Sequence, residues 1–167
     1  MAESNNREKL PPRFAVDRNL LRLARWLRLM GIDVIGDPSW SAAEALTHAR
    51  VDKRYLLTRD KRFGLAADAF YVKSHLFRDQ LREVLVRFPF DPQRDAFTRC
   101  AECNDLLHQV SRAALHSRVP PFVYASHESF AVCDSCGKVY WPATHRQRIL
   151  DEIARLKPAN SDALSYR

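Results

Sequence analysis

The four cysteines of the chain form two C-x-x-C pairs, Cys100–Cys103 and Cys133–Cys136. A C-x-x-C turn points two sulfurs at one centre, and two such turns supply the four thiolates of a tetrahedral metal site. Gly137 directly follows the second pair and gives the backbone the freedom that such a turn needs. The spacing therefore predicts one structural zinc in a ribbon, which carries an inserted loop because 29 residues separate the two pairs.

Other uses of these cysteines fit the sequence less well. Disulfides seldom persist inside cells, and we expect a cytoplasmic protein without a membrane partner. The N-terminus is polar, and no window reaches the roughly 18 apolar residues of a membrane span. A thioredoxin-like motif needs a single pair in a βαβ setting. Catalytic zinc needs an open coordination position, which four thiolates close.

Two acids follow segments that are typical of strands. Asp17 ends the apolar run 14–16, and Asp60 follows the run 54–58. Ligands of an open parallel sheet bind beyond the carboxyl ends of its strands, so the two carboxylates converge if these strands are neighbours. Carboxylates without cysteine or histidine suit Mg²⁺ or Mn²⁺, ions that activate water for phosphodiester cleavage.

Each acid also has a purely structural interpretation. Asp is a favoured N-cap residue, so Asp17 and Asp60 can cap the helices expected after them. Glu44 stands three residues after Ser41, which is the spacing of a capping box. The residue spacing leaves both interpretations open.

Arginines accompany the acids. Arg18, Arg22, Arg25 and Arg28 fall within about a third of the circumference of one helix, at 100° per residue. Such a stripe beside a metal site suits a phosphate backbone, although a solvated helix face has the same pattern. Two more arginines, Arg59 and Arg62, flank the second acid. The net charge of +7, most of it in residues 1–97, also suits a polyanionic partner such as RNA.

The elements that must position these residues alternate between strand and helix. Apolar residues at 20, 23, 24, 27 and 30 have the spacing of a helix that packs on a sheet. Strands are expected near 14–17, 33–35, 54–58 and 70–73, and helices near 19–30, from 41, from 61, over 77–87 and near 146–156. The alternation predicts an α/β fold, with a parallel sheet covered on both faces.

Pro89 and Pro92 interrupt this alternation before the cysteines begin. The chain is therefore expected to divide into a disordered lead-in (1–12), an α/β domain (13–90), a zinc ribbon (97–148), and a short helix with a tail (149–167).

Several of these stretches also occur together in a known family. They are Phe14-Ala-Val-Asp17, Leu23-Ala-Arg-Trp-Leu-Arg28, Leu56-Leu-Thr-Arg-Asp60, Arg118-Val-Pro-Pro121 and Cys133-x-x-Cys136-Gly-Lys-Val-Tyr-Trp141. In this order, over about residues 13–148, the chain resembles the Mut-seven C-terminal RNase family. The resemblance implies a PIN-like, three-layer nuclease fold with a C-terminal zinc ribbon, and metal-dependent cleavage of RNA.

The resemblance also assigns roles to residues. Asp17 and Asp60 match the acidic motif positions of the family, and Glu44 is similar to the acid near the start of its second helix. A fourth acid has no recognisable motif here, with Asp68 and Asp79 as candidates.

These observations predict an endoribonuclease with Mg²⁺ or Mn²⁺ held by Asp17, Asp60 and Glu44. The predicted RNA contacts are Arg22, Arg25, Arg28, Arg59 and Arg62, and the ribbon is expected to dock RNA or a protein partner. A non-catalytic RNA- or ribosome-binding protein is the alternative, and a DNA-directed nuclease also fits the sequence.

Overall fold

The computed structural model describes residues 11–142 and 144–156, so most of the expected lead-in and the tail after residue 156 lie outside the described residues. Its larger sheet has four parallel strands in the order β2-β1-β3-β4: β1 (Phe14–Val16), β2 (Val34–Gly36), β3 (Tyr55–Thr58) and β4 (Ala69–Tyr71). The predicted parallel sheet is confirmed. Strands β1 and β3 are neighbours, as convergence of Asp17 and Asp60 requires.

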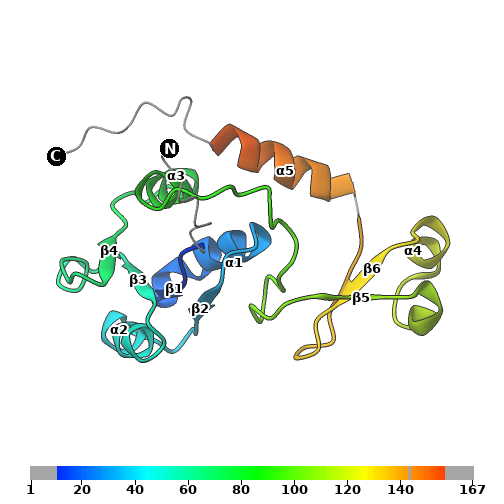
Figure 1. Cartoon of the computed structure of the whole chain (residues 1–167), viewed down its shortest axis with the longest axis horizontal. Coiled ribbons are helices and arrows are strands. Elements are labelled where there is room, and N and C mark those ends of the chain that lie inside the picture. The colour runs from blue at the N-terminus through cyan, green and yellow to red at the C-terminus, as the bar shows by residue number, and fades with distance from the viewer. Residues whose placement is uncertain (1–10, 143, 157–167) are drawn as a thin grey trace, which may run out of the picture.

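Helices cover both faces of this sheet, because side chains of a strand alternate between its faces. Phe14 and Val16 join one core with helices α1 (Leu21–Leu29), α3 (Phe77–Arg87) and α5 (Thr144–Leu156). Ala15 points to the other face and packs on helix α2 (Ala42–Val51). Figure 1 shows α2 and α3 on opposite sides of the strands. The result is the expected three-layer arrangement.

Helix α1 follows the predicted periodicity. All five apolar positions, residues 20, 23, 24, 27 and 30, are buried. A short 3-10 helix, η1 (Arg18–Leu20), leads into it. The helix ends before Gly31, whose φ is +83°, and a Cβ at Gly31 would lie 2.1 Å from the Asp95 carbonyl oxygen. Only glycine satisfies both the backbone conformation and the close approach.

The helix expected from Lys61 is absent, and this prediction was wrong. Residues 61–65 form turns, in which the N–H groups of Phe63 and Gly64 both return to the Asp60 carbonyl. Gly64 lies against Tyr71, where a Cβ would be 2.5 Å from the Tyr71 Cβ. The chain must re-enter the sheet at β4 within a few residues, so the turn cannot lengthen into a helix.

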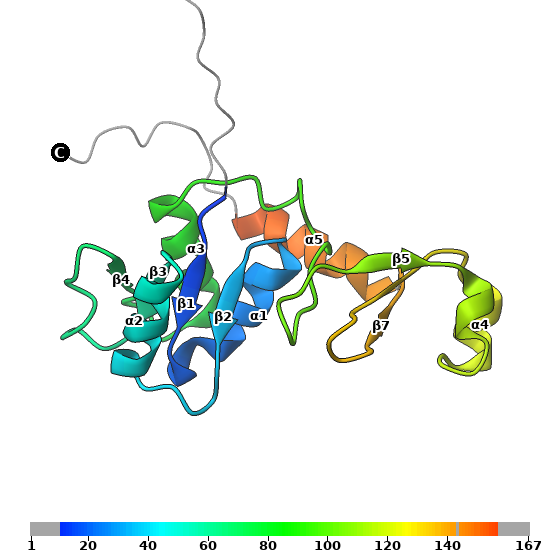
Figure 2. The ribbon, with the colours of Figure 1, turned by 60° about the horizontal axis from the view of Figure 1, so that its bottom comes forward.

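The cysteine-bearing segment forms a second, antiparallel sheet in the order β5-β6-β7, with β5 (His108–Val110), β6 (Phe130–Val132) and β7 (Val139–Tyr140). The inserted loop folds into η2 (Arg112–Leu115) and α4 (Pro121–Ser126) at the end distant from the α/β layers (Figures 1 and 2). Leu115 and Val119 pack there on Phe130 and Val132.

Helix α5 follows the ribbon in sequence but returns to the first core. Ile153 and Leu156 are buried in the cluster that contains β1 and α1. An ion pair between Glu152 and Arg78 joins α5 to α3. The helix spans the predicted boundary at residues 148–149, and its residues up to Leu156 pack on the α/β layers. No helix in the described part of the chain has the length and hydropathy to cross a membrane.

Asp33, just before β2, joins the two parts of the molecule. Its carboxylate accepts hydrogen bonds from Arg54 at 2.5 Å and from the Asn104 side-chain amide at 2.7 Å. The Arg54 side chain is only 6% exposed, and the Asn104 oxygen accepts the Val34 N–H at 2.8 Å. Burial alone would raise the pKa of Asp33, but these hydrogen bonds lower it to about 2. One charged group therefore ties the start of the ribbon to β2.

Replacing this charge should destabilise the whole protein. Asp33→Asn leaves the buried Arg54 with Asp52 as its remaining carboxylate partner, and we expect a loss of about 3 kcal/mol near neutral pH. The folded-state pKa of Asp33 lies below the ordinary value of 3.8 for an aspartate, so its contribution to stability is complete above that pH and is lost as pH falls toward about 2.

Urea unfolding of both proteins at pH 7 and at pH 2 to 4 measures this effect. The difference between them should shrink as pH falls. Asp134→Asn is the control, because the Asp134 side chain is 84% exposed and its loss should change stability by less than about 0.5 kcal/mol. An equal effect of both substitutions would contradict the anchoring role of Asp33.

Candidate metal centre and acidic edge

The four cysteines converge as predicted. All are free thiols, and their four sulfur atoms lie within 4.8 Å of one another. Cys100 Sγ and Cys136 Sγ are 3.7 Å apart. This matches the edge of a tetrahedron with Zn–S bonds of about 2.3 Å and is far longer than a disulfide. The cluster can therefore hold a metal ion and fits a zinc ribbon.

The two turns that carry the sulfurs share one backbone design. Asn104 follows the first pair with φ +75°, and Gly137 follows the second with φ +69°. In each turn the N–H of this residue bonds to the carbonyl of the first cysteine, at 3.0 Å to Cys100 and 2.8 Å to Cys133. The left-handed residue turns the chain around the sulfurs, which confirms the role predicted for Gly137.

Cys100 is the one cysteine of the first turn whose surroundings favour the thiolate, since the contact with Cys136 raises the pKa of Cys103. The Tyr140 hydroxyl contacts Cys100 Sγ at 3.1 Å, and the Cys103 N–H points to the same sulfur at 3.4 Å. Burial would raise the pKa of Cys100, but these hydrogen bonds lower it to about 7. A sulfur in this environment releases its proton readily, as metal ligation requires.

Asp17 occupies the carboxyl end of β1 and is fully buried. One carboxylate oxygen accepts the Asn19 N–H at 2.7 Å, and the other accepts the Thr58 hydroxyl at 2.6 Å. Asp17 thus caps η1, as its structural interpretation predicted. Both of these partners are neutral, although a buried carboxylate normally requires a compensating positive charge.

Asp60 is connected to Asp17 through Thr58. The Thr58 hydroxyl oxygen accepts the Asp60 N–H at 3.0 Å while it donates to Asp17. The Asp60 carboxylate is held by Arg62, with Nη2 at 2.6 Å from Oδ2 and Nε at 3.0 Å from Oδ1. These contacts lower the pKa of Asp60. The Arg62 side chain is 81% exposed, so this clamp reaches in from the surface.

Glu44 completes its capping box. Its carboxylate accepts the Ser41 N–H and the Ser41 hydroxyl, both at 2.7 Å, and the Ser41 oxygen accepts the Glu44 N–H at 3.3 Å. The Ser41 contacts lower the pKa of Glu44. The side chain is therefore engaged at the start of α2, as its structural interpretation predicted.

The predicted arginine stripe is only partly on the surface. Arg22 and Arg25 are exposed, with Arg22 over the Phe77 ring at 4.3 Å and Arg25 paired with Glu102 at 3.1 Å. Arg28 is 7% exposed, and its guanidinium donates to the carbonyls of Val34, Ala101 and Glu102. The prediction of an RNA contact is wrong for Arg28, because the first cysteine turn (Cys100–Cys103) covers its guanidinium.

Arg59, on the other side of Asp60, contacts the His75 ring, with Nη2 at 2.7 Å from Nδ1. It therefore lies near the loop after β4, close to the same edge of the sheet. Arg59 and Arg62 remain candidates for phosphate contacts at the acidic edge.

A family model for the Mut7-C RNAse domain matches residues 12–153, which is most of the chain. The chain belongs to this family. Searches of the curated proteins and of the solved structures returned no significant match. The match runs from β1 through the ribbon and into α5, so the Mut7-C RNase domain contains both sheets.

In this Mut7-C RNase domain, the two candidates for a fourth acid, Asp68 and Asp79, lie on opposite sides of strand β4 in the sequence. Asp68 lies before β4, at the amino-terminal edge of the sheet, and pairs with Arg50 at 2.8 Å. It is at the wrong edge to join Asp17. Asp79 lies in the first turn of α3, after β4, and pairs with Arg82 at 2.7 Å.

Two acids at the carboxyl-terminal edge were missed from the sequence. Asp37 follows β2 and accepts the Ser39 N–H at 2.8 Å. Glu83 accepts the N–H groups of Lys73 and Ser74, directly after β4. The sequence pattern could have identified Asp37 as a candidate acid, because it follows a predicted strand as Asp17 does. Glu83 lies inside a helix, and only the fold places it there.

These acids are not gathered into a ready-made cage. Among residues 11–142 and 144–156, the four cysteines are the one group of three or more candidate ligands whose atoms all lie within 4.8 Å. Each edge carboxylate instead has a partner within the protein.

The metal content of the ribbon can be measured directly. We expect about one zinc per chain, lost from Cys133→Ser because three thiolates hold the ion more weakly than four. Ser135→Ala, in the same turn but without a ligand atom, should keep its metal. Elemental analysis with far-UV circular dichroism reports both metal and fold. A metal-free wild type with a Cys100–Cys103 disulfide after reducing purification would contradict the zinc site.

Proposed function

We propose that this protein is a metal-dependent endoribonuclease whose reaction centre is the carboxyl-terminal edge of the parallel sheet. The observation that carries the proposal is the hydrogen-bonded chain from Asp17 through Thr58 to Asp60. It brings two carboxylate-bearing residues from neighbouring strands to one edge, in a domain whose family is described as an RNase. The second metal of the proposal is the zinc held by the four cysteines, in a structural role.

The burial of Asp17 supports a cation at this edge. Its side chain is fully buried and bonded to neutral donors. A charge in that position is costly unless an opposite charge approaches it. The donors are hard oxygens without sulfur or imidazole, which suits Mg²⁺ or Mn²⁺. When bound, such an ion supplies an activated water and neutralises charge on the phosphodiester.

The remaining residues have roles that follow from their contacts. Thr58 and the Asn19 N–H fix the Asp17 oxygens, so that this carboxylate is pre-positioned. Arg62 holds Asp60 in the absence of the ion and can turn outward, because its side chain is largely exposed. Arg22 and Arg25 lie on exposed positions of α1, where they can neutralise phosphates on either side of the cut.

A non-catalytic RNA-binding protein is the second candidate, and a specific observation favours it. The carboxylates of three candidate acids already have partners within the protein. Glu44 caps α2, Asp60 pairs with Arg62, and Asp79 pairs with Arg82. A chain that had lost its catalysis could retain its fold through such pairs. Activity measurements separate the two candidates.

Asp17→Asn should abolish cleavage. The amide keeps the size of the side chain but removes the negative ligand, so we expect at least a 100-fold loss of metal-dependent activity. Purified protein with total cellular RNA and either Mg²⁺ or Mn²⁺ provides the measurement. Asp134→Asn removes an equal charge from an exposed position of the ribbon and should cleave as wild type does. A fully active Asp17→Asn protein, or a wild type inert on every RNA, would favour the binding protein.

Glu44→Gln separates capping from metal ligation at α2. Gln fills the return half of a capping box about as well as Glu. Because the structure shows both halves of the box, we expect activity and thermal stability close to wild type. A loss of activity by orders of magnitude at unchanged melting temperature would instead make Glu44 a third metal ligand.

A further inference from the structure

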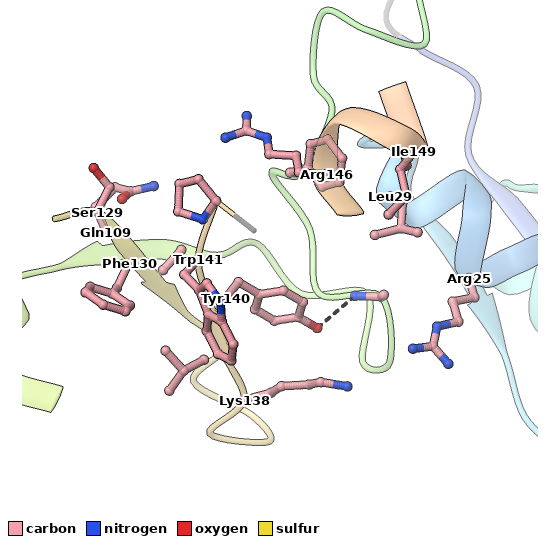
Figure 3. A pocket seen from close by; sticks show the side chains of 15 residues that line it. Arg25, Leu29, Gln109, Ser129, Phe130, Lys138, Tyr140, Trp141, Arg146 and Ile149 are labelled. Carbon is pink, nitrogen blue, oxygen red and sulfur yellow. Dashed lines mark hydrogen bonds between the residues drawn. The ribbon is translucent and has the colours of Figure 1, made fainter. Parts of the chain in front are cut away.

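A cavity of about 440 Å³ lies where α1, the ribbon and α5 meet (Figure 3). Its volume falls in the range of small-ligand sites. Phe97, Tyr140 and Trp141 line it together with aliphatic side chains from α1 and α5. These three rings are only partly buried, so ring surface remains accessible from the cavity, whereas the fourth aromatic residue of the lining, Phe130, is buried.

The charged residues that line the cavity are all cationic: Arg25 from α1, Lys138 before β7, and Arg146 from α5. Figure 3 shows Arg25 and Lys138 at one side of the cavity and Arg146 at the other. Glu102 pairs with both Arg25 and Lys138, each at 3.1 Å, so one carboxylate is shared by two cations. Arg146 lies over the Phe97 ring at 4.8 Å. The cavity therefore combines an aromatic interior with a net positive rim.

Phe97, which lines the cavity, has an unusual backbone conformation. Its φ is +64°, a conformation that aromatic residues rarely adopt. The Phe97 N–H donates to the Leu29 carbonyl at 2.8 Å, which holds the ring at the end of α1. Strained residues of this kind cluster at ligand sites.

We propose that this cavity binds one unpaired base of an RNA strand, with Trp141 as a stacking surface and Arg146 and Lys138 near the adjoining phosphates. Aromatic faces with cationic neighbours are the usual way in which single-stranded nucleic acid is held. The proposal takes its partner, RNA, from the proposed function and adds a site that lies away from the acidic edge.

Helix α1 connects this site with the acids. It runs from Leu21, four residues after Asp17, to Leu29 at the cavity, with the exposed Arg22 and Arg25 between them. From Leu21 to Leu29 the helix spans about 12 Å at 1.5 Å per residue, which is roughly three to four stacked nucleotides at 3.4 Å each. The ribbon therefore holds RNA a few nucleotides from the proposed cut.

Binding is tested in the zinc-loaded Asp17→Asn protein with all 167 residues, in which the proposed cleavage is blocked. Fluorescence anisotropy compares a labelled single-stranded RNA with the same strand made abasic at successive positions. Trp141→Leu should weaken binding about 10-fold, because base stacking on the ring is lost, and Trp141→Phe should restore most of it. Loss of one base should weaken binding in the parent protein but not in Trp141→Leu, a non-additivity that a general folding defect does not produce.

Arg146→Ala and Arg148→Ala form a matched pair. Both residues are exposed on α5, but Arg148 borders a different groove, beside Trp26 and Phe77. Arg146→Ala should weaken RNA binding more than Arg148→Ala does. Equal affinity and equal abasic sensitivity of the parent and Trp141→Leu, with zinc content and circular dichroism intact, would overturn the proposal. A cavity that binds an apolar peptide would give that result.

The two proposals fail separately. A wild type that cleaves no RNA but binds it in a Trp141-dependent way would remove the nuclease proposal and leave this site. A wild type that cleaves RNA with a KM unchanged by Trp141→Leu would remove this site and leave the nuclease.

Discussion

The guanidinium of Arg28 is the contact on which the arrangement of the two parts depends. From the last turn of α1 it donates to Val34 in the sheet and to Ala101 and Glu102 in the first cysteine turn. Burial lowers its pKa, and the nearby cysteines and acids act in the opposite direction. A buried cation with satisfied hydrogen bonds admits few alternative positions. Arg28 therefore restricts how the ribbon can be oriented on α1.

The metal site and the acidic edge are connected through this contact. The first cysteine turn fixes Ala101 and Glu102, these carbonyls fix Arg28, and Arg28 belongs to the helix that begins beside Asp17. Asn104 adds a second connection to β2 through Val34 and Asp33. A metal that orders the ribbon also orders one wall of the proposed RNA path.

Local patterns predicted the features that depend on local chemistry. The spacing of apolar residues identified α1, the Ser41–Glu44 pair identified the start of α2, and the cysteine spacing identified the metal cluster. Arg28 was misjudged because helix periodicity places it beside exposed arginines, whereas the segment that buries it lies more than 70 residues away. The turn at 61–65 was misjudged for a similar reason, since the position of β4 limits it. The aromatic cavity joins three distant segments, and no single stretch carries its signature.

Helix α5 is synthesised after the ribbon but packs in the core that contains β1. Ile153 and Leu156 close a core whose other members begin at Phe14, so the first layers remain open while the ribbon is synthesised. Domains generally fold as units during synthesis, and exposed apolar surface invites misassembly. Here the cysteine turns emerge before the closing helix does. The ribbon can therefore order before α5 is available to pack on the α/β layers.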